Sequence, residues 1–360
     1  MKIQLILLAG SLWIIPLTFM AQEKTLNSTA SVLKQVSAED PKDRNNNFYD
    51  NTEMYALTGS PLTIEGEVEN PGPADLSGLP FRSIIIKEAL LKDGGDNRFV
   101  GAYRYDGYSL FDILENRILN KKNKEAYHPI IDLYVIIENN QGEKVVLSWG
   151  EIYYPNHLHE ILIATRVGRI VPSKTNDLWP LPQESKLVIG NDLLSERNIS
   201  NPVKITVKSY AREIPVNRDL TPLYSPGFKI TSDSKVLSEI TTLPEGTRKE
   251  TFNAIFYGRG RGIHSTTPFS GALLEQILKP YVSITSRDLK TGLVVVIGLD
   301  GYRCIYSLSE VVNRSDQEEI LLVDGKSDDG SGQYRLYPAC DFFSDRAIKA
   351  ISEISLTTAE

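Results

Sequence analysis

The chain has 360 residues, of which 41% are hydrophobic and 24% are charged, a composition typical of a soluble folded protein long enough for two domains. Its formal net charge is −7, and no basic block of the kind that follows a phosphate backbone is present, so nucleic acid is not an expected partner. Beyond the N-terminal segment, no apolar run is long enough to span a membrane.

The N-terminal segment has the layout of a secretory signal. Lys2 supplies a short positive region, Ile3–Ile15 is almost wholly apolar, and Pro16 breaks any helix before a plausible cleavage point at Ala21–Gln22. We predict a signal peptide over residues 1–21 and a protein that is periplasmic or secreted and does not span the membrane after cleavage. An uncleaved anchor is the alternative, but the apolar run is shorter than the roughly 20 residues that a spanning helix needs.

Residues 22–53 form a polar segment that is rich in Asn, Ser, Lys and Asp, as in Asn45–Asn47. Such a segment cannot bury enough apolar surface to offset its chain entropy. We therefore predict a disordered tether.

The rest of the chain contains an internal repeat of five blocks in one order. The blocks pair Tyr105–Leu110 with Phe269–Leu274, Ile136–Glu143 with Val295–Tyr302, Leu147–Ile152 with Tyr306–Val311, Glu160–Ile163 with Glu319–Leu322, and Lys186–Ile205 with Arg335–Ile354. The predicted fold class is α+β, a mixed, β-rich sheet domain with short covering helices, duplicated in tandem. The first repeat spans residues 54–210 and the second 246–360. An extended, proline-rich linker at 211–245 joins them, with an edge strand at Phe228–Thr231.

Several elements follow from local patterns in the repeats. The apolar run Leu293–Ile297 between glycines is typical of a strand buried on both faces. Asp300–Gly301 indicates a hairpin turn, with Cys304–Tyr306 as the returning strand. Apolar residues at helical spacing predict short covering helices over Leu110–Ile118 and Leu273–Leu278.

Two polar pairs recur in both copies. They are Ser148 with Glu151, matched by Ser307 with Glu310, and Asp192 with Arg197, matched by Asp341 with Arg346. Each Ser-x-x-Glu pair predicts a capping box, in which the serine oxygen accepts from a backbone amide and the glutamate reaches back. Each Asp–Arg pair is interpreted as an ion pair that holds the last strand in place, not as an acid/base couple.

Four stretches of the second copy occur in an order and spacing found in one family. They are Phe252–Phe256 leading into Tyr257–Arg261, Phe269-x-Gly271 with Leu274 and Ile277–Leu278, Leu299–Tyr302, and Tyr334–Pro338 followed by Arg346–Lys349. In these stretches the second copy resembles the molybdopterin-binding domain of sulfite-oxidase-type enzymes. The matching family features are a Cys-x-Gly-Asn-x-Arg loop, a Gly-x-x-Leu-x-x-x-Leu helix, an Asp-Gly-Tyr hairpin and a Leu-Arg-Leu-Val-Val-Pro ending. The first copy shares the middle blocks without a clear counterpart of the cofactor loop.

The departures from that family concern its chemistry. Phe256 stands where the family has the cysteine whose thiolate binds molybdenum, and Arg259 stands where it has asparagine. The closing tryptophan of the family is Ala350. The resemblance therefore implies the fold in both copies, and no cofactor is expected. Molybdopterin, with its metal held without a protein thiolate, is the alternative.

The loop Tyr257–His264 is the strongest candidate site. Its alternating glycines would let backbone amides converge on an anion, and its arginines and histidine would complete the site. By resemblance, it falls where the family holds the pterin phosphate and ring. We predict that a small anionic or pterin-like ligand binds Tyr257, Gly258, Arg259, Gly260, Arg261 and His264. The alternative is a glycine-rich turn with solvated arginines.

Other candidate sites have a structural interpretation beside the functional one. His157-x-His159 would suit a metal ion, but a surface loop is favoured because no third histidine or cysteine is nearby. Asp324–Asp329 does not have the spacing of an EF-hand loop, which favours a solvated turn. Cys304 and Cys340 either pair as a disulfide in an oxidising compartment or are buried free thiols.

No catalytic Ser/His/Asp order, P-loop or dinucleotide-binding fingerprint is present. We therefore expect an exported, non-catalytic binding or interaction protein, whose partner is a small anionic or pterin-like ligand or an envelope protein. One alternative is a molybdopterin-dependent oxidoreductase of the sulfite oxidase type. The other is a purely structural envelope protein.

Overall fold

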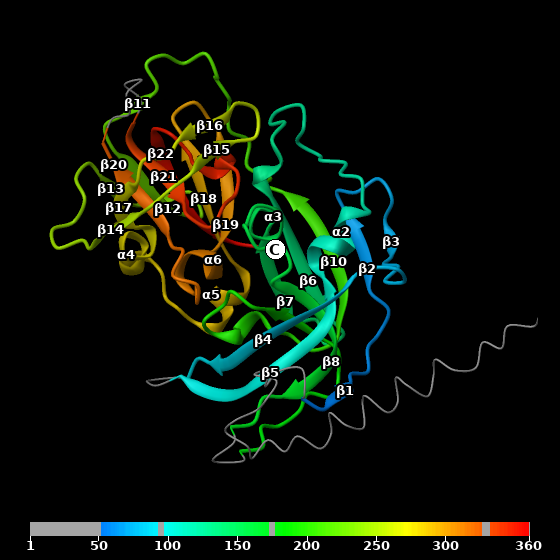
Figure 1. Ribbon diagram of the computed structural model, residues 1–360. Helices are drawn as coiled ribbons and strands as arrows, with labels where there is room; N and C mark the ends of the chain where they lie inside the picture. Colours follow the sequence, from blue (N-terminus) through cyan, green and yellow to red (C-terminus); the bar gives the residue numbers. More distant parts are fainter. Residues whose placement is uncertain (1–51, 93–96, 173–176, 326–331, 360) are drawn as a thin grey trace, which may run out of the picture. The chain divides into compact units, whose positions relative to one another are not determined.

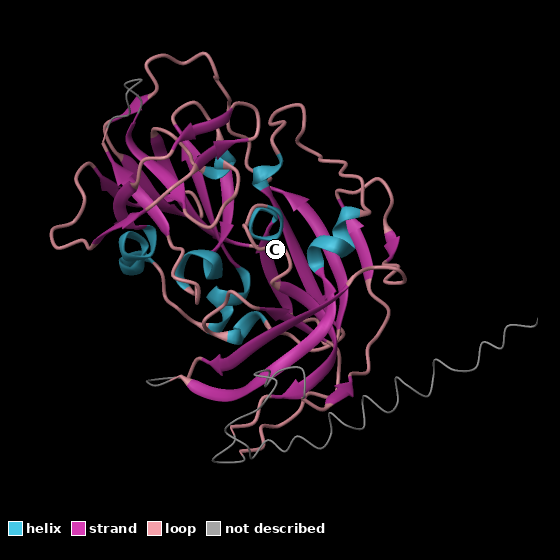
Figure 2. Ribbon diagram, viewed as in Figure 1, coloured by secondary structure: helices cyan, strands magenta, loops and turns pink. Residues whose placement is uncertain are grey.

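The computed structural model describes residues 52–92, 97–172, 177–325 and 332–359. The predicted signal peptide, almost all of the predicted tether and residues 326–329 of the predicted aspartate-rich turn lie outside these ranges. Strands dominate the described residues, and the helices are short (Figure 2). The β-rich, mixed character predicted from the sequence is therefore confirmed.

The first half of the chain builds two five-stranded sheets (Figure 1). Sheet 1 contains β1 (Met54–Ala56), β4 (Phe81–Leu90), β5 (Arg98–Ser109), β8 (Ile161–Arg169) and β9 (Lys186–Ile189). Sheet 2 contains β2 (Thr63–Gly66), β3 (Gly72–Pro73), β6 (Leu133–Asn139), β7 (Lys144–Ser148) and β10 (Pro202–Ser209). The order of sheet 2 is β3-β2-β10-β6-β7, and only β2 and β10 run parallel.

The second half also builds two five-stranded sheets. Sheet 3 contains β11 (Tyr224–Ser225), β14 (Lys249–Phe252), β17 (Phe269–Leu273), β20 (Ile320–Asp324) and β21 (Gly332–Pro338). Sheet 4 contains β12 (Phe228–Ser232), β13 (Lys235–Ile240), β18 (Gly292–Gly298), β19 (Arg303–Ser307) and β22 (Ile351–Thr358). The order of sheet 4 is β13-β12-β22-β18-β19, again with one parallel pair, β12 and β22. Its pairing pattern is that of sheet 2.

Residues 211–245, interpreted above as a linker, contain three strands of sheets 3 and 4. Among them, β12 is not the predicted edge strand, because it pairs with β13 on one side and with β22 on the other. Its residues Phe228 and Ile230 are fully buried in the core of the second half. The prolines around this strand led to the prediction of a linker. The position of β12 in the sheet depends instead on its pairing with strands, one of which, β22, lies far away in the chain.

The strand predicted at Leu293–Ile297 is confirmed as β18, and all of its residues are buried. Alternate side chains of β18 enter the core of the second half and a separate apolar cluster with β6 and β7 of sheet 2. The hairpin turn at Asp300–Gly301 is also confirmed, since β18 pairs with β19 and Gly301 has a φ of 77°.

Short helices form where the apolar spacing and the two Ser-x-x-Glu pairs predict them, and the helix at Ser286–Thr291 was not predicted. The helices are α2 (Leu110–Glu115), α3 (Trp149–Tyr153), α4 (Leu274–Leu278), α5 (Ser286–Thr291) and α6 (Leu308–Val312), with 3₁₀ turns η1 (Ile130–Asp132), η2 (Ser195–Arg197), η3 (Lys279–Tyr281) and η4 (Ser344–Arg346). Because α2 ends at Glu115, the prediction that Ile118 joins its apolar face is wrong. Ile118 is 60% exposed.

The two predicted capping boxes differ in outcome. At α3 the box is complete, with Ser148 accepting from the amide of Glu151 and the Glu151 carboxylate accepting from the amide of Ser148. At α6, the Ser307 hydroxyl accepts from the amide of Glu310. The second bond of the box, in which the Ser307 amide would donate to the Glu310 carboxylate, is not formed. That carboxylate is used at the junction between the two halves.

A buried cluster of charged side chains lies between the two halves of the chain. In the first half, this cluster is built around Arg197. Arg197 is 1% exposed. It donates to Asp192 at 2.7 and 2.8 Å and to Glu151 at 3.0 and 3.1 Å. It also reaches into the second half, where the Ser307 hydroxyl lies 3.0 Å away.

Arg346 occupies the corresponding place on the other side and is fully buried. It pairs with Asp341 and Glu310 at 2.6 Å and lies 3.3 Å from the Ser148 hydroxyl of the first half. That hydroxyl in turn donates to Glu310 at 2.7 Å. The two predicted Asp–Arg ion pairs are therefore confirmed. They lie at a buried junction, where each guanidinium must be matched by carboxylates because an uncompensated buried charge is strongly destabilising.

We expect Arg346→Ala to lower the free energy of unfolding by about 3–5 kcal/mol, because it leaves Asp341 and Glu310 buried without a cation. The matched control is Arg212→Ala. Arg212 forms a bidentate ion pair with Glu353, and its side chain is 38% exposed. That change should cost about 1 kcal/mol or less. Urea unfolding of both variants measures the difference, and equal losses would contradict the interpretation.

Stability should also fall as the pH rises through neutrality. Burial raises the pKa of Glu151 to about 7 from an ordinary value of 4.5, although Arg197 opposes the shift. The folded chain thus binds more protons than the unfolded chain between these values, so the stability from this group is present at low pH and is lost as the pH rises through 7. In the Glu151→Gln variant, this contribution to the dependence of the free energy of unfolding on pH should disappear. Urea unfolding at about pH 5 and about pH 8 tests it, and an unchanged slope would refute the assignment.

Candidate anion-binding site

The predicted loop Tyr257–His264 folds as a small β-hairpin. β15 (Phe256–Gly258) pairs with β16 (Gly262–Ser265), and these two strands form a sheet of their own. Among the three glycines only Gly262 has a positive φ, 74°. Gly260 lies in the turn between the two strands, whereas Gly258 and Gly262 lie at the facing ends of β15 and β16.

Gly258 is required by close packing across the hairpin. A Cβ atom at this position would overlap the Nε2 atom of His264, whereas one at Gly260 would meet open space. Since Gly258 is buried, its missing side chain is what lets the His264 imidazole lie across the hairpin.

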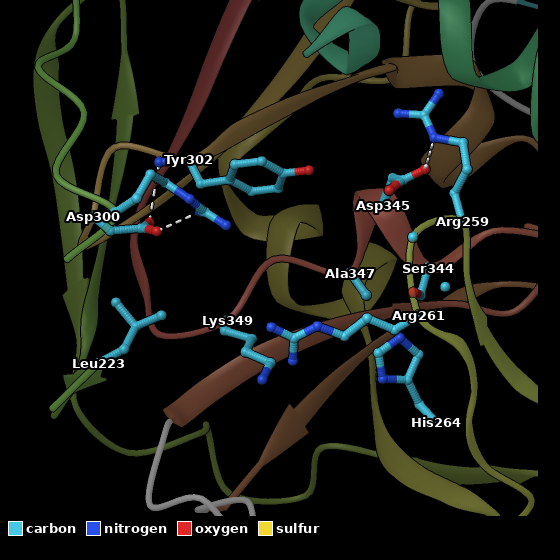
Figure 3. A pocket seen from close by; sticks show the side chains of 13 residues that line it. Leu223, Arg259, Arg261, His264, Asp300, Tyr302, Ser344, Asp345, Ala347 and Lys349 are labelled. Atoms are coloured by element: carbon cyan, nitrogen blue, oxygen red, sulfur yellow. Dashed lines mark hydrogen bonds and ion pairs between the residues drawn. The ribbon is translucent and has the colours of Figure 1, made fainter. Parts of the chain in front are cut away.

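A cavity of about 380 Å³ opens beside this hairpin (Figure 3). It is lined by Arg218, Leu223, Gly258, Arg259, Gly260, Arg261, His264, Asp300, Tyr302, Ser344, Asp345, Ala347 and Lys349. Five of the six predicted site residues line it, and Tyr257 does not. In Figure 3, Arg261 and His264 lie on the hairpin side, while Tyr302 and Asp300 face them from the turn after β18.

The cavity is a basic site in an acidic protein. Four basic side chains, those of Arg218, Arg259, Arg261 and Lys349, stand against two carboxylates, those of Asp300 and Asp345. Basic side chains thus outnumber carboxylates in the lining, whereas the whole chain has a formal net charge of −7. A local reversal of charge in a concave site favours an anionic ligand.

Two of the arginines are held by the carboxylates. The Arg218 guanidinium donates to Asp300 at 2.6 Å and lies over the Tyr302 ring, 4.3 Å from its centre. The Arg259 Nε atom lies 3.4 Å from Asp345. Because both arginine side chains are more than half exposed, these contacts orient the guanidinium groups more than they stabilise the fold.

Arg261 differs from these arginines. Among the residues that the structure describes, it has neither an ion-pair partner nor a hydrogen-bond partner, and it is exposed. Its five N–H donors are therefore available to a ligand in the cavity.

Tyr302 adds an uncharged donor to the cavity wall. Burial, with a smaller effect of Asp345, raises the pKa of its phenol well above the ordinary value of 10. The hydroxyl therefore stays protonated at neutral pH and can donate a hydrogen bond.

The residue at the family's cysteine position does not face the cavity. Phe256 packs against the rings of Phe269 and His264, at centroid distances of 5.1 and 5.4 Å. Cys304 and Cys340 are buried free thiols and not a disulfide, and burial raises the pKa of both. The described lining of the cavity thus offers no cysteine thiolate to a metal ion.

His157 and His159 lie in the turn between α3 and β8, the surface loop that the sequence favours. The structure adds a contact that the sequence did not predict: the Nδ1 atom of His159 lies 3.0 Å from the Ser109 hydroxyl and 3.7 Å from Asp112. A catalytic triad would use different ring nitrogens for these two groups, and Ser109 is also the buried N-cap of α2. We interpret the contact as structural. Within the described ranges, no cluster of three or more His, Cys, Asp or Glu suits a metal ion.

The cavity residues outside the hairpin were not predicted as site residues. Arg218 and Leu223 precede β12, Ser344 and Asp345 belong to η4, and Lys349 follows it. A partial signal was present, since Asp300, Tyr302, Ala347 and Lys349 belong to stretches that carry the family resemblance. Nothing in the sequence indicated the remaining cavity residues.

Comparison of the chain with protein-family models, with curated proteins and with solved structures gives no match. Within the described part of the chain, no helix combines the length and the apolar character needed to cross a bilayer.

We expect Gly258→Ala to displace the His264 imidazole, because the added methyl group and Nε2 cannot occupy the same space. Gly260→Ala is the matched control, since its methyl group would meet nothing within 4 Å. The chain has four histidines, so the ring signals can be assigned and followed by NMR. A shift of the His264 signal in the control alone, or in neither variant, would refute the packing argument.

Proposed function

We propose that this protein is an exported, non-catalytic binding protein that holds a small anion in the cavity beside the β15–β16 hairpin. The observation that carries the proposal is the excess of positive charge in this cavity, together with the available guanidinium of Arg261. A guanidinium recognises phosphate and carboxylate groups through paired, charge-assisted hydrogen bonds.

The size of the cavity admits an inorganic anion such as phosphate, and also a larger ligand that carries such a group. Its volume of about 380 Å³ lies at the small end of the range typical of ligand sites. Tyr302 and Leu223 give it an apolar wall, and the carboxylates of Asp300 and Asp345 could accept from hydroxyl or amino groups of the ligand. A pterin-like phosphate is one member of this class.

We further propose that the chain is a tandem duplication of one domain, of the sulfite-oxidase molybdopterin-domain type that the second copy resembles. The common pairing order of sheets 2 and 4 supports this proposal, as do the corresponding positions of Arg197 and Arg346 at the junction. Fold says little about function by itself. Our choice among the candidate functions therefore depends on the chemistry of the site.

The cavity favours ligand binding over a purely structural role. The oxidoreductase alternative lacks a supporting observation, since neither cysteine lines the cavity and the family's cysteine position is held by Phe256. We propose that the ligand is bound and released unchanged.

Titration calorimetry with inorganic phosphate tests the site at low salt, where screening is weak. We expect Arg261→Gln to lower the affinity about tenfold or more, because it removes charge-assisted hydrogen bonds. Lys235→Gln, at an exposed position on β13 outside the cavity lining, should leave the affinity unchanged. Equal effects of the two substitutions, or no measurable binding by the unmodified protein, would overturn the proposal.

A further inference from the structure

The face of the hairpin that does not line the cavity is apolar and exposed. Ile255 is 74% exposed, Ile263 62%, Phe342 52% and Tyr257 39%. Soluble proteins expose single apolar side chains routinely, but a group of neighbouring ones marks an interaction surface.

Tyr257, Ile263 and Phe342 are neighbours in space, and Ile255 directly precedes β15 in the chain. Tyr257 and Ile263 are partners across the hairpin, so their side chains lie on one face. The Tyr257 ring lies 5.7 Å from the ring of Phe342, which contacts Phe343 at 4.9 Å. Ile255 stands two residues before Tyr257. We refer to Ile255, Tyr257, Ile263 and Phe342 as the apolar face of the hairpin.

Within the hairpin segment itself the charge is of one sign. Residues 251–274 contain no Asp or Glu, although the chain as a whole has 46 of them. The same stretch holds Arg259, Arg261 and His264, all exposed at the tip and on β16. The apolar face is thus bordered by positive charge, in a chain that is otherwise acidic.

The hairpin presents these residues without the support of a larger sheet. Among the described strands, β15 and β16 pair with each other and with no third strand. Phe256 fixes the hairpin from beneath, through ring contacts with Phe269 and Tyr337, and Arg259 reaches Asp345. Apolar and basic groups are therefore displayed together on a small surface element.

We propose that the hairpin docks on a lipid surface that carries anionic headgroups. Aliphatic and aromatic side chains enter the interfacial region, and neighbouring arginines meet the lipid phosphates. Charge complementarity favours this occupant: the hairpin is attracted to an anionic surface, whereas the rest of the chain, with its excess of acidic residues, is repelled from it. This inference goes beyond the proposed function, because the apolar face takes no part in lining the cavity.

Co-sedimentation with vesicles tests the proposal on the folded protein. We expect binding to vesicles of phosphatidylcholine and phosphatidylglycerol in equal parts, and binding about tenfold or more weaker to phosphatidylcholine alone, since each arginine near an anionic surface adds about fivefold. Added salt should weaken the binding to the mixed vesicles.

The apolar face is tested with the double variant Ile255→Asn and Ile263→Asn. We expect its binding to mixed vesicles to fall about tenfold or more, because two exposed aliphatic side chains no longer enter the interface. The matched control is Val236→Asn with Leu237→Asn, at positions 51% and 40% exposed on the edge strand β13, and it should bind as the unmodified protein does. Circular dichroism confirms that both variants are folded.

Absence of binding to either vesicle, equal binding to both, or an equal loss in the control variant would overturn the lipid proposal. Capture of a protein partner by the same face, without vesicle binding, would overturn it as well. Titration of the Ile255/Ile263 variant with inorganic phosphate separates the two proposals. Retained phosphate binding together with lost vesicle binding in this variant supports both proposals. Vesicle binding by an unmodified protein that binds no phosphate overturns only the proposal that the cavity binds an anion.

Discussion

Burial of two guanidinium groups is the constraint on which the junction of the two halves depends. Arg197 and Arg346 are almost completely removed from water, and a buried cation is tolerated only where carboxylates and hydroxyls surround it. Each arginine takes carboxylates from its own half and a serine hydroxyl from the other. The caps of α3 and α6 provide these hydroxyls, so one set of side chains both begins two helices and fixes where the halves meet.

The same constraint reaches the cavity through η4. Arg346 ends this 3₁₀ turn, and its direct neighbours Asp345 and Ala347 line the cavity. Asp345, the residue before the buried Arg346, lies 3.4 Å from the Nε atom of Arg259 on the hairpin. The buried guanidinium of Arg346 thus stands next in the chain to Asp345, one of the two carboxylates that line the cavity. The hairpin itself is attached to no larger sheet, as is common for binding elements carried by a rigid scaffold.

Much of the local structure was predictable, because its determinants are close together in the sequence. The apolar run of β18, the turn at Gly301, the capping serines and the Asp–Arg pairs each depend on residues within about ten positions of one another. The same holds for the hairpin glycines and arginines, which is why five of the six predicted site residues line the cavity. Tyr257 is the exception, since strand alternation turns its side chain to the other face.

The sequence by itself determined the β-rich character, the short helices, the paired charges and a basic, glycine-rich loop. Only the tertiary structure decided that β12 is an interior strand, that Glu310 serves the junction in place of a second capping box, and that the two cysteines remain unpaired. It alone assembled the cavity, whose lining comes from four separate segments of the second half. The physical reason is that burial, ion pairing and the closure of a cavity depend on contacts between distant residues, which no local pattern encodes.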